Sequence, residues 1–182
     1  MHEIMRESLE NLVTIWYNDN QRKTGTYRIN GRKVGNGMKI STKGRYALRL
    51  MLDLAAHKDD GFVALKDIAQ RQNISKKYLE QIIPMLNSPE LLQTNRGFQG
   101  GYKLAQSPEK YTVGMILRLT EGSLAPVACL AQTPNACERA GECPTLFIWE
   151  GLYKVIGDYL DSITLQDILD KEQEGYANSY VI

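Results

Sequence analysis

The feature that most constrains this fold is the spacing of apolar residues between residues 41 and 105, which is helical at first and then extended. Three consecutive segments have helical spacing, and we expect helices over residues 41–57, 65–72 and 76–86. Ser41 or Thr42 can cap the first of these helices and Ser75 the third. Pro84 removes a backbone donor late in the third helix, so we expect a kink or a helix end there.

Two short strands follow these helices, over residues 91–95 and 102–104, and a glycine-rich turn joins them. Helices in this order, followed by a hairpin, are typical of a winged helix-turn-helix. We therefore predict a mostly α-helical fold with a small β-hairpin wing.

The second half of the chain has a different organisation. A connecting helix is expected over residues 112–121, a loop from Gly122 to Pro144 carries all three cysteines, and a long helix capped by Thr145 is expected to follow over residues 145–161. A shorter helix is expected over residues 165–172. Large apolar residues cover more than one face of the long helix, which predicts a homodimer in which this is the dimerisation helix. The alternative is that the helix packs across a large monomeric core.

The first 37 residues are expected to be an N-terminal extension. Leu9, Leu12, Val13 and Trp16 have helical spacing, whereas residues 18–37 are polar and glycine-rich, as in a flexible linker. Met38 could serve as an alternative translation start, so the extension is either flexible or an artefact of an upstream start. The expected division is extension 1–37, DNA-binding domain 38–105, connecting helix and cysteine loop 106–144, and dimerisation helix with C-terminal helix or tail 145–182.

Composition excludes several classes of protein. The 182 residues are 43% hydrophobic and 24% charged, as in a globular protein rather than a disordered or collagen-like chain. No apolar run approaches the roughly 20 residues of a membrane span, and no signal-peptide pattern is visible, so we expect a cytoplasmic protein. Residues 38–104 carry 11 basic and 6 acidic groups, whereas residues 105–182 carry 5 and 11. The basic segment suggests contact with a polyanion.

The third helix and the hairpin carry residues that suit duplex DNA. Lysines near a helix start suit phosphates, Glu and Gln can contact base edges, and an arginine on the wing suits a narrow minor groove. The candidate DNA-binding residues there are Lys76, Lys77, Glu80, Gln81 and Arg96. Residues on the first helix could add phosphate contacts: Lys43, Arg45 and Arg49. The alternative for the third helix is an ordinary solvated face.

The three cysteines, Cys129, Cys137 and Cys143, lie in one proline-bearing loop. An odd number excludes a complete disulfide framework, and a zinc site normally has four ligands, often with a Cys-x-x-Cys pair that is absent here. An iron–sulfur cluster fits better, because thiolates bind it and a loop can wrap around it. Redox-sensing thiols, zinc and inert cysteines remain alternatives. Motifs typical of enzymes (a phosphate-binding glycine loop, HExxH, a nucleophile elbow) are absent, so we expect no enzymatic activity.

Together these motifs resemble the Rrf-type winged-helix transcriptional regulators, those of the IscR type in particular. The resemblance is carried by MKISTKGRYALRLMLDLA (38–55), LKDIAQRQNISKKYLEQ (65–81), RGFQGGYKLA (96–105), VGMILRLTEGSLAPVAC (113–129) and SITLQDIL (162–169). It implies a homodimeric bacterial regulator that binds a palindromic operator. It also implies that Lys77, Glu80 and Gln81 contact base edges and that Arg96 contacts the minor groove.

The resemblance further implies that the three cysteines ligate an iron–sulfur cluster, [2Fe–2S] rather than [4Fe–4S], whose occupancy switches DNA affinity. Leu146 stands where the IscR type has a histidine ligand, and Arg45 stands where nitric-oxide-sensing members have an aspartate ligand, so the fourth ligand is unknown. Relatives without the cysteines give an alternative. In that case the chain is a cluster-free regulator of cysteine or sulfur metabolism, acting as a thiol redox sensor or through a metabolic-enzyme partner.

Overall fold

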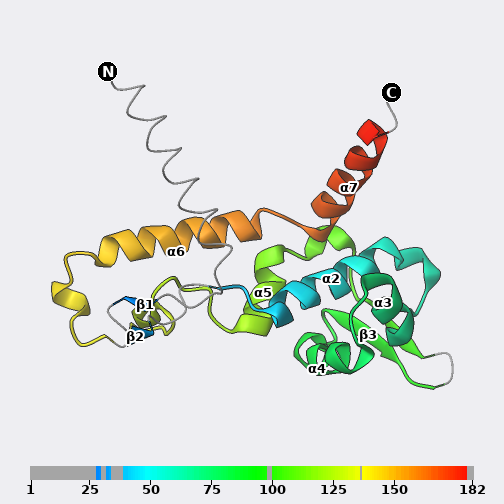
Figure 1. Ribbon diagram of the computed structural model, residues 1–182, viewed down its shortest axis with the longest axis horizontal. Helices are drawn as coiled ribbons and strands as arrows, with labels where there is room; N and C mark the ends of the chain where they lie inside the picture. The colour runs from blue at the N-terminus through cyan, green and yellow to red at the C-terminus, as the bar shows by residue number, and fades with distance from the viewer. Residues whose placement is uncertain (1–27, 30–31, 34–38, 98–99, 136, 180–182) are drawn as a thin grey trace. The chain divides into compact units, whose positions relative to one another are not determined.

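The computed structural model describes residues 28–29, 32–33, 39–97, 100–135 and 137–179 (Figure 1). The chain divides into two compact units, residues 1–39 and 40–182. Within the first unit, β1 (Arg28–Ile29) pairs antiparallel with β2 (Arg32–Lys33), inside the segment expected to be a linker. The remainder of that linker and the helical spacing from Leu9 to Trp16 lie outside the described residues.

The second unit begins with the expected helix-turn-helix, formed by α2 (Thr42–Ala56), α3 (Leu65–Gln72) and α4 (Lys76–Leu86). The hydroxyl of Ser41 caps α2 by accepting a hydrogen bond from Gly44 N–H at 3.2 Å. Ser75 caps α4 in the same way. Asn73 ends α3 in the left-handed conformation (φ 51°), which turns the chain toward α4.

Pro84 does not end α4 early, because the helix continues to Leu86. A proline at this position removes the N–H that would bond to the carbonyl of Glu80. Glu80 and Pro84 both lie on the exposed side of the helix, so water can satisfy that carbonyl.

The wing consists of β3 (Leu92–Asn95) and β4 (Gly101–Leu104), which pair antiparallel. Val63 adds an isolated bridge to this hairpin, because its N–H and carbonyl each bond to Tyr102 at 2.9 Å. The extended segment between α2 and α3 is therefore attached to the wing, and the hairpin is fixed to the helices on both sides.

The second half contains α5 (Val113–Glu121), α6 (Leu146–Asp161) and α7 (Leu165–Ser179), the last of which extends beyond its expected end at residue 172. Short 3₁₀ turns separate the larger elements: η1 (Lys58–Asp60), η2 (Pro108–Lys110), η3 (Ala128–Leu130) and η4 (Ala140–Glu142). Thr145 precedes α6 but does not cap it, contrary to expectation, because its hydroxyl is bonded to other side chains. Within the described residues, none of the helices has the length and apolar character needed to cross a membrane.

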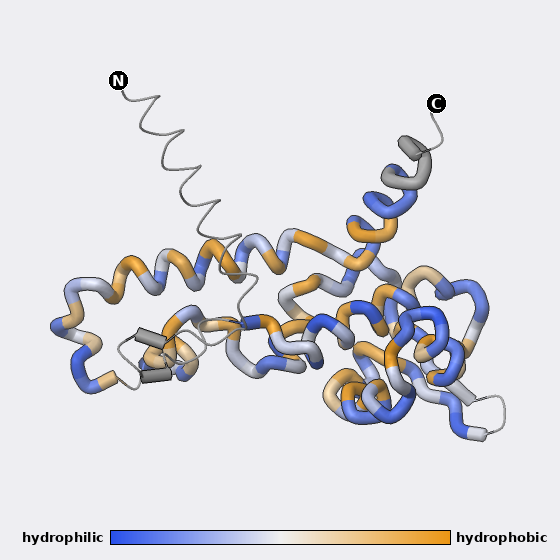
Figure 2. The backbone as a smooth tube through the Cα atoms, in the orientation of Figure 1, coloured by the Kyte–Doolittle hydropathy of each residue, from blue (hydrophilic) through white to orange (hydrophobic). Residues whose placement is uncertain are grey.

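The main hydrophobic core lies among α2, α3, α4 and the wing, and it includes Leu50, Ile68, Leu79, Ile82 and Leu104. Tyr111 is buried in it, and its hydroxyl donates to the carbonyl of Leu91 at 2.8 Å. A second, smaller core consists of Val113, Leu117 and Leu124, against which Tyr153 and Leu160 of α6 pack. Figure 2 shows that hydrophobic positions recur along the whole of α6, beyond the part that reaches this second core.

Candidate nucleic-acid interface and cysteine loop

The face of α4 that points away from the core carries the predicted base-contacting residues. Leu79, Ile82, Ile83 and Leu86 are buried, which leaves the opposite side of the helix in solvent. The exposed side carries Lys76, Lys77, Glu80 and Gln81. The structure therefore places these four polar side chains on one accessible surface, as insertion into a major groove requires.

An ion pair joins two of these residues. Lys76 Nζ lies 3.4 Å from Glu80 Oε1, and the two side chains are 59% and 53% exposed. An exposed pair of this kind contributes little free energy, so it can open when a phosphate or a base edge offers another partner.

The basic residues of α2 have different roles. Arg45 is exposed and donates to Thr42 Oγ1 at 3.1 Å, and Lys43 is half-buried. Arg49 is bonded to Gln72 instead of projecting freely: its Nε donates to Gln72 Oε1 at 3.1 Å, and its Nη2 donates to the Gln72 carbonyl. In this structure Arg49 thus fixes the end of α3 against α2, a role that the charge pattern alone does not reveal.

Arg96 follows β3 directly and is exposed, as is Gly97 after it, whereas Phe98 and Gln99 lie outside the described residues. A hydrogen bond from Thr94 Oγ1 to Asn87 Oδ1, 3.0 Å long, joins the wing to the end of α4. A hollow of about 450 Å³ lies between them, lined by Asn87, Pro89, Leu92, Gln93, Thr94 and Arg96. The contact between Asn87 and Thr94 was not predicted from the sequence, although an asparagine just after a helix often accepts or donates a hydrogen bond there.

The three cysteines lie along the loop between α5 and α6. Cys129 lies in η3 and Cys143 follows η4, and both are half-buried, whereas Cys137 between them is exposed. All three are free thiols. Across the described residues, no group of three His, Cys, Asp or Glu side chains is arranged to hold a metal ion. The structure therefore does not bring the predicted cluster ligands together.

Cys143 has a polar environment at the start of α6. Its Sγ lies 3.5 Å from Thr145 Oγ1, which also accepts a hydrogen bond from Trp149 Nε1 at 3.3 Å. The Thr145 hydroxyl, together with the backbone N–H groups of Thr145 and Leu146, lowers the pKa of the Cys143 thiol. This environment favours the thiolate, the form that binds metals and reacts with oxidants.

The donor set of this loop suits iron in its chemistry, because three thiols are the ligands that iron–sulfur clusters use. The two positions considered for a fourth ligand do not supply one, since Leu146 is apolar and the Arg45 guanidinium cannot coordinate a cation.

A carboxylate connects the start of this loop to the helix-turn-helix. Glu121, the last residue of α5, accepts hydrogen bonds at its Oε1 from Ser41 N–H (3.1 Å) and Ser41 Oγ (2.7 Å). The first residues of α2 and the beginning of the cysteine loop are thereby held at the same point.

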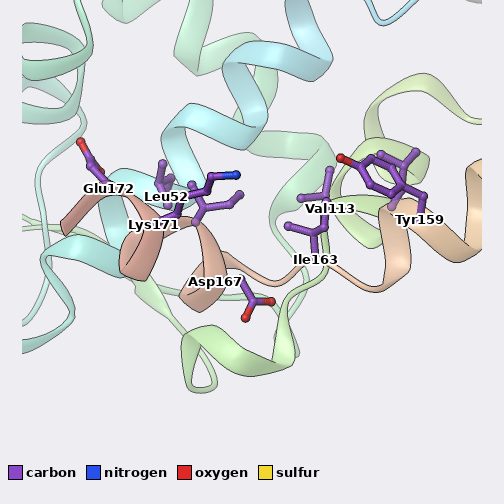
Figure 3. A pocket seen from close by; sticks show the side chains of 9 residues that line it. Leu52, Val113, Tyr159, Ile163, Asp167, Lys171 and Glu172 are labelled. Carbon is purple, nitrogen blue, oxygen red and sulfur yellow. The ribbon is translucent and has the colours of Figure 1, made fainter. Parts of the chain in front are cut away.

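A mainly apolar hollow of about 800 Å³ lies beside the junction of α6 and α7 (Figure 3). Apolar residues from α2, α5, α6, the α6–α7 connection and α7 line it, with charged residues of α7 beside them: Leu52, Val113, Tyr159, Leu160, Ile163, Ile168, Asp167, Lys171 and Glu172. Tyr159 also belongs to a set of large apolar residues of α6 that are exposed in the protomer.

A helix-turn-helix with a hairpin wing, an exposed polar face on α4 and an arginine on the wing define the class of winged helix-turn-helix transcriptional regulators. Within that class, the chain belongs to the Rrf2 family. The family model, described as an iron-dependent transcriptional regulator, matches residues 40–171.

Individual relatives agree with this assignment. The HTH-type transcriptional regulator IscR of Pectobacterium carotovorum is 37% identical over 136 residues, which is 75% of this chain and 82% of that protein. Two solved structures are similar as well. IscR of T. potens is 40% identical with a TM-score of 0.58, over 76% of this chain and 91% of its own. CymR, the global cysteine regulator of B. subtilis, is 38% identical with a TM-score of 0.55, over 73% and 97%. The predicted resemblance and the predicted fold class are confirmed.

Proposed function

We propose that this chain is a homodimeric bacterial transcriptional regulator that acts in the cytoplasm and binds a palindromic operator. The observation that carries the DNA-binding part is the exposed polar face of α4, joined to the wing by the hydrogen bond between Thr94 and Asn87. A recognition helix and a wing that are held together can enter adjacent grooves of one half-site.

Each predicted contact residue has a distinct role in this proposal. Lys77, Glu80 and Gln81 contact base edges in the major groove, and Arg96 contacts the minor groove. The phosphate contacts come from Lys43, Arg45 and Lys76, which give affinity without sequence preference.

The dimer interface is assigned to α6. Its exposed apolar side chains are Phe147, Ile148, Leu152, Val155 and Tyr159, and Phe147 is 72% exposed in the protomer. Such a surface is costly to leave in water. Because Tyr159 also lines the hollow beside α7, this surface continues into the hollow, and we assign both to a second copy of the chain.

Cys129, Cys137 and Cys143 are proposed to hold an iron–sulfur cluster that switches DNA affinity, with [2Fe–2S] favoured over [4Fe–4S] and a fourth ligand from outside these residues. When bound, such a cluster supplies a centre that responds to iron, oxidants or nitric oxide. The chain supplies thiols from both ends of the loop, Cys129 near α5 and Cys143 next to α6. The loop therefore joins the dimerisation helix α6 to α5, whose last residue, Glu121, bonds to Ser41 at the start of α2, so a change at the thiols can affect both the dimerisation helix and the helix-turn-helix.

The DNA-binding part is tested by selection from a random duplex library with the purified protein at fixed salt. We expect a palindromic consensus, and we expect Arg96→Ala to weaken binding to it by about five- to a hundredfold while the variant stays folded. Lys110→Ala is the matched control, because this exposed cation lies outside the proposed interface. Selection of no consensus, or equal loss in both variants, rejects the assignment.

The cluster is tested by anaerobic purification, with iron and sulfide analysis beside a visible absorption spectrum. A brown protein is expected, and Cys137→Ser should lose the visible absorption whereas Gln132→Ala, in the same exposed loop, should keep it. A protein that stays colourless after reconstitution with iron and sulfide rejects the cluster.

A second candidate function follows if the cluster is rejected. Cys137 is exposed and the Cys143 environment favours the thiolate, so the loop also suits a thiol redox sensor. The similarity to CymR supports a cluster-free regulator of cysteine or sulfur metabolism, acting through its own thiols or through a metabolic-enzyme partner. Iron content per dimer separates the two functions.

A further inference from the structure

The long helix α6 is attached to the rest of the protomer mainly at its C-terminal end (Figure 1). Its principal packing partner is α5, and its residues on the second core are Tyr153 and Leu160. At the other end, Phe147 and Ile148 are 72% and 47% exposed. The direction of α6 is therefore set by contacts of the part from Tyr153 to Asp161, and we call the contacts around Asp161 the α5–α6 joint.

A bidentate ion pair lies at the centre of this joint. Arg118 of α5 donates from Nη1 to Asp161 Oδ1 at 2.6 Å and from Nη2 to Asp161 Oδ2 at 2.7 Å. Thr112 Oγ1 lies 3.4 Å from the same Oδ1. Two parallel hydrogen bonds between a planar guanidinium and a carboxylate fix orientation as well as distance.

The same joint depends on a close approach of side chain to backbone. A Cβ placed on Gly114, one turn before Arg118, would lie 2.1 Å from Asp161 Oδ1 and 2.9 Å from Arg118 Nη1. At Gly157, one turn before Asp161, a Cβ would lie 3.6 Å from Arg118 Nη2. The ion pair therefore occupies space that only a glycine at position 114 leaves free.

The chain just beyond Asp161 is also fixed. Val113 N–H donates to the Ile163 carbonyl and Leu165 N–H donates to the Tyr111 carbonyl, both at 2.9 Å. These bonds form an isolated bridge that holds the α6–α7 connection against the start of α5. Because these bonds hold the connection against α5, a change in the direction of α6 would require rotation about the joint, which the ion pair and the packing of Tyr153 and Leu160 oppose.

We propose that Arg118 and Asp161 are positioning residues that set the operator spacing this regulator accepts. The inference rests on the proposed function, in which α6 joins two winged helices over a palindrome. The angle at which α6 leaves each protomer then determines the distance and rotation between the two α4 helices.

Because α6 is long, a small change in this angle moves its far end by a large distance. A helix of 16 residues is about 24 Å long, so a rotation of about 10° at one end moves the other by about 4 Å. That displacement exceeds the spacing of successive base pairs, roughly 3.4 Å along each strand. Half-sites read by two recognition helices must lie at a fixed spacing, so a looser joint should accept neighbouring spacings.

The test measures binding to a set of duplexes that carry the selected palindrome with its half-sites moved together or apart by one base pair. We expect the wild type to prefer one spacing by about tenfold, and Arg118→Gln, Asp161→Asn and Gly114→Ala to reduce that preference to about threefold or less. Arg118→Lys keeps the charge but not the two parallel bonds, so it should also broaden the profile. Oligomeric state and melting temperature are measured for each variant.

Lys154→Gln is the matched control, because Lys154 pairs with Asp158 on α6 alone and does not join two helices. It should keep the wild-type spacing profile. A wild type that selects no palindrome overturns the proposed function and this inference with it. Three other outcomes overturn the inference alone, provided that the wild type selects a palindrome. These are a spacing profile that is flat in wild type, one that is the same in wild type and joint variants, and one that changes only in variants that have lost the dimer.

Discussion

Asp53 is the buried charged residue of the helix-turn-helix, with its side chain only 2% exposed. It accepts two hydrogen bonds from Arg71, at 3.1 and 2.6 Å, and one from Gln72 Nε2 at 3.0 Å. Arg71 itself is 35% exposed. The pair connects α2 to α3. Without its partner, Arg71 could still be solvated by water, whereas the buried Asp53 carboxylate could not.

This difference predicts unequal costs of substitution. Arg71→Met leaves a buried carboxylate without its charged partner and should lower the free energy of unfolding by about 3 kcal/mol or more. Asp53→Asn leaves an arginine that can turn into water, and we expect roughly half that cost. Urea denaturation followed by circular dichroism measures both. Equal costs, or a larger cost for Asp53→Asn, would contradict this view of the pair.

The ion pair of the α5–α6 joint predicts an acid dependence. The Arg118 guanidinium lowers the pKa of the Asp161 carboxyl, so its contribution to stability is complete above the ordinary pKa of an aspartate, about 3.9, and is lost as the pH falls through the lower native value. Asp161 is 45% exposed, so solvent screening keeps the contribution below about 1 kcal/mol.

We therefore expect the stability difference between wild type and Asp161→Asn to be small at pH 7 and to shrink as the pH falls below the ordinary pKa of an aspartate, about 3.9. Thermal melts across this range, repeated at high salt, measure it. A difference that grows on acidification would show that the carboxyl is stabilised in its protonated form.

At the scale of elements, the start of α2 depends on a contact from α5. The Glu121 carboxylate that bonds to Ser41 lies directly over Gly44, where a Cβ would come within 2.1 Å of its Oε1. Gly44 is buried in the first turn of α2. A glycine in a helix costs stability, so its presence here is explained by the space that Glu121 needs, with Leu117 Cδ2 also close, 3.2 Å from such a Cβ.

This predicts strong non-additivity in a double-mutant cycle. Gly44→Ala alone should cost about 1–2 kcal/mol, because the methyl group displaces Glu121 from Ser41. In a Glu121→Ala background, the same change should cost much less, since the contact with Leu117 alone then opposes the higher helix propensity of alanine. Additive costs in the two backgrounds would exclude the steric explanation.

Local signals allowed most of these elements to be predicted. The caps Ser41 and Ser75, the turn at Asn73 and the hairpin all depend on residues close in sequence. The predicted cap at Thr145 is wrong. Its hydroxyl bonds to the side chains of Cys143 and Trp149 instead of to the backbone of α6, and residue spacing does not reveal that competition. The burial of Tyr111 depends on its contact with Leu91, twenty residues away.

In the candidate site too, features set by local sequence could be predicted and contacts between distant residues could not. The exposed side of α4 follows from helical periodicity, so its polar residues could be predicted from sequence. The contact between Ser41 and Glu121 joins residues 80 positions apart, and no local pattern indicates it. The cysteines could be identified as a group, but their spacing does not determine how the loop places them.

At the scale of the whole molecule, the proposed dimer buries the exposed apolar surface of α6 against a second copy of the chain. Val155 and Tyr159 are each 64% exposed and Phe147 is 72% exposed, one or more turns apart along the helix. Burial of a large apolar side chain contributes roughly 1.5–3 kcal/mol.

A single charge on this surface should therefore separate the subunits. We expect Val155→Glu or Phe147→Glu to raise the dimer dissociation constant by about ten- to a hundredfold, with the helical content of the winged helix unchanged. Analytical ultracentrifugation measures the constant. Glu150→Gln, an exposed polar position on the same helix, is the control and should leave it unchanged. A dimer that tolerates both charges would assign the interface elsewhere.

The hydrogen bond between Trp149 and Thr145 gives the molecule a built-in optical reporter. The chain has only two tryptophans, so a Trp16→Phe variant would emit from this indole alone. Thr145 also contacts the Cys143 sulfur, so we expect oxidation or ligation of that sulfur to change the polarity and quenching around the indole. Emission intensity can thus follow the state of the loop in real time, without a dye and without opening an anaerobic cuvette.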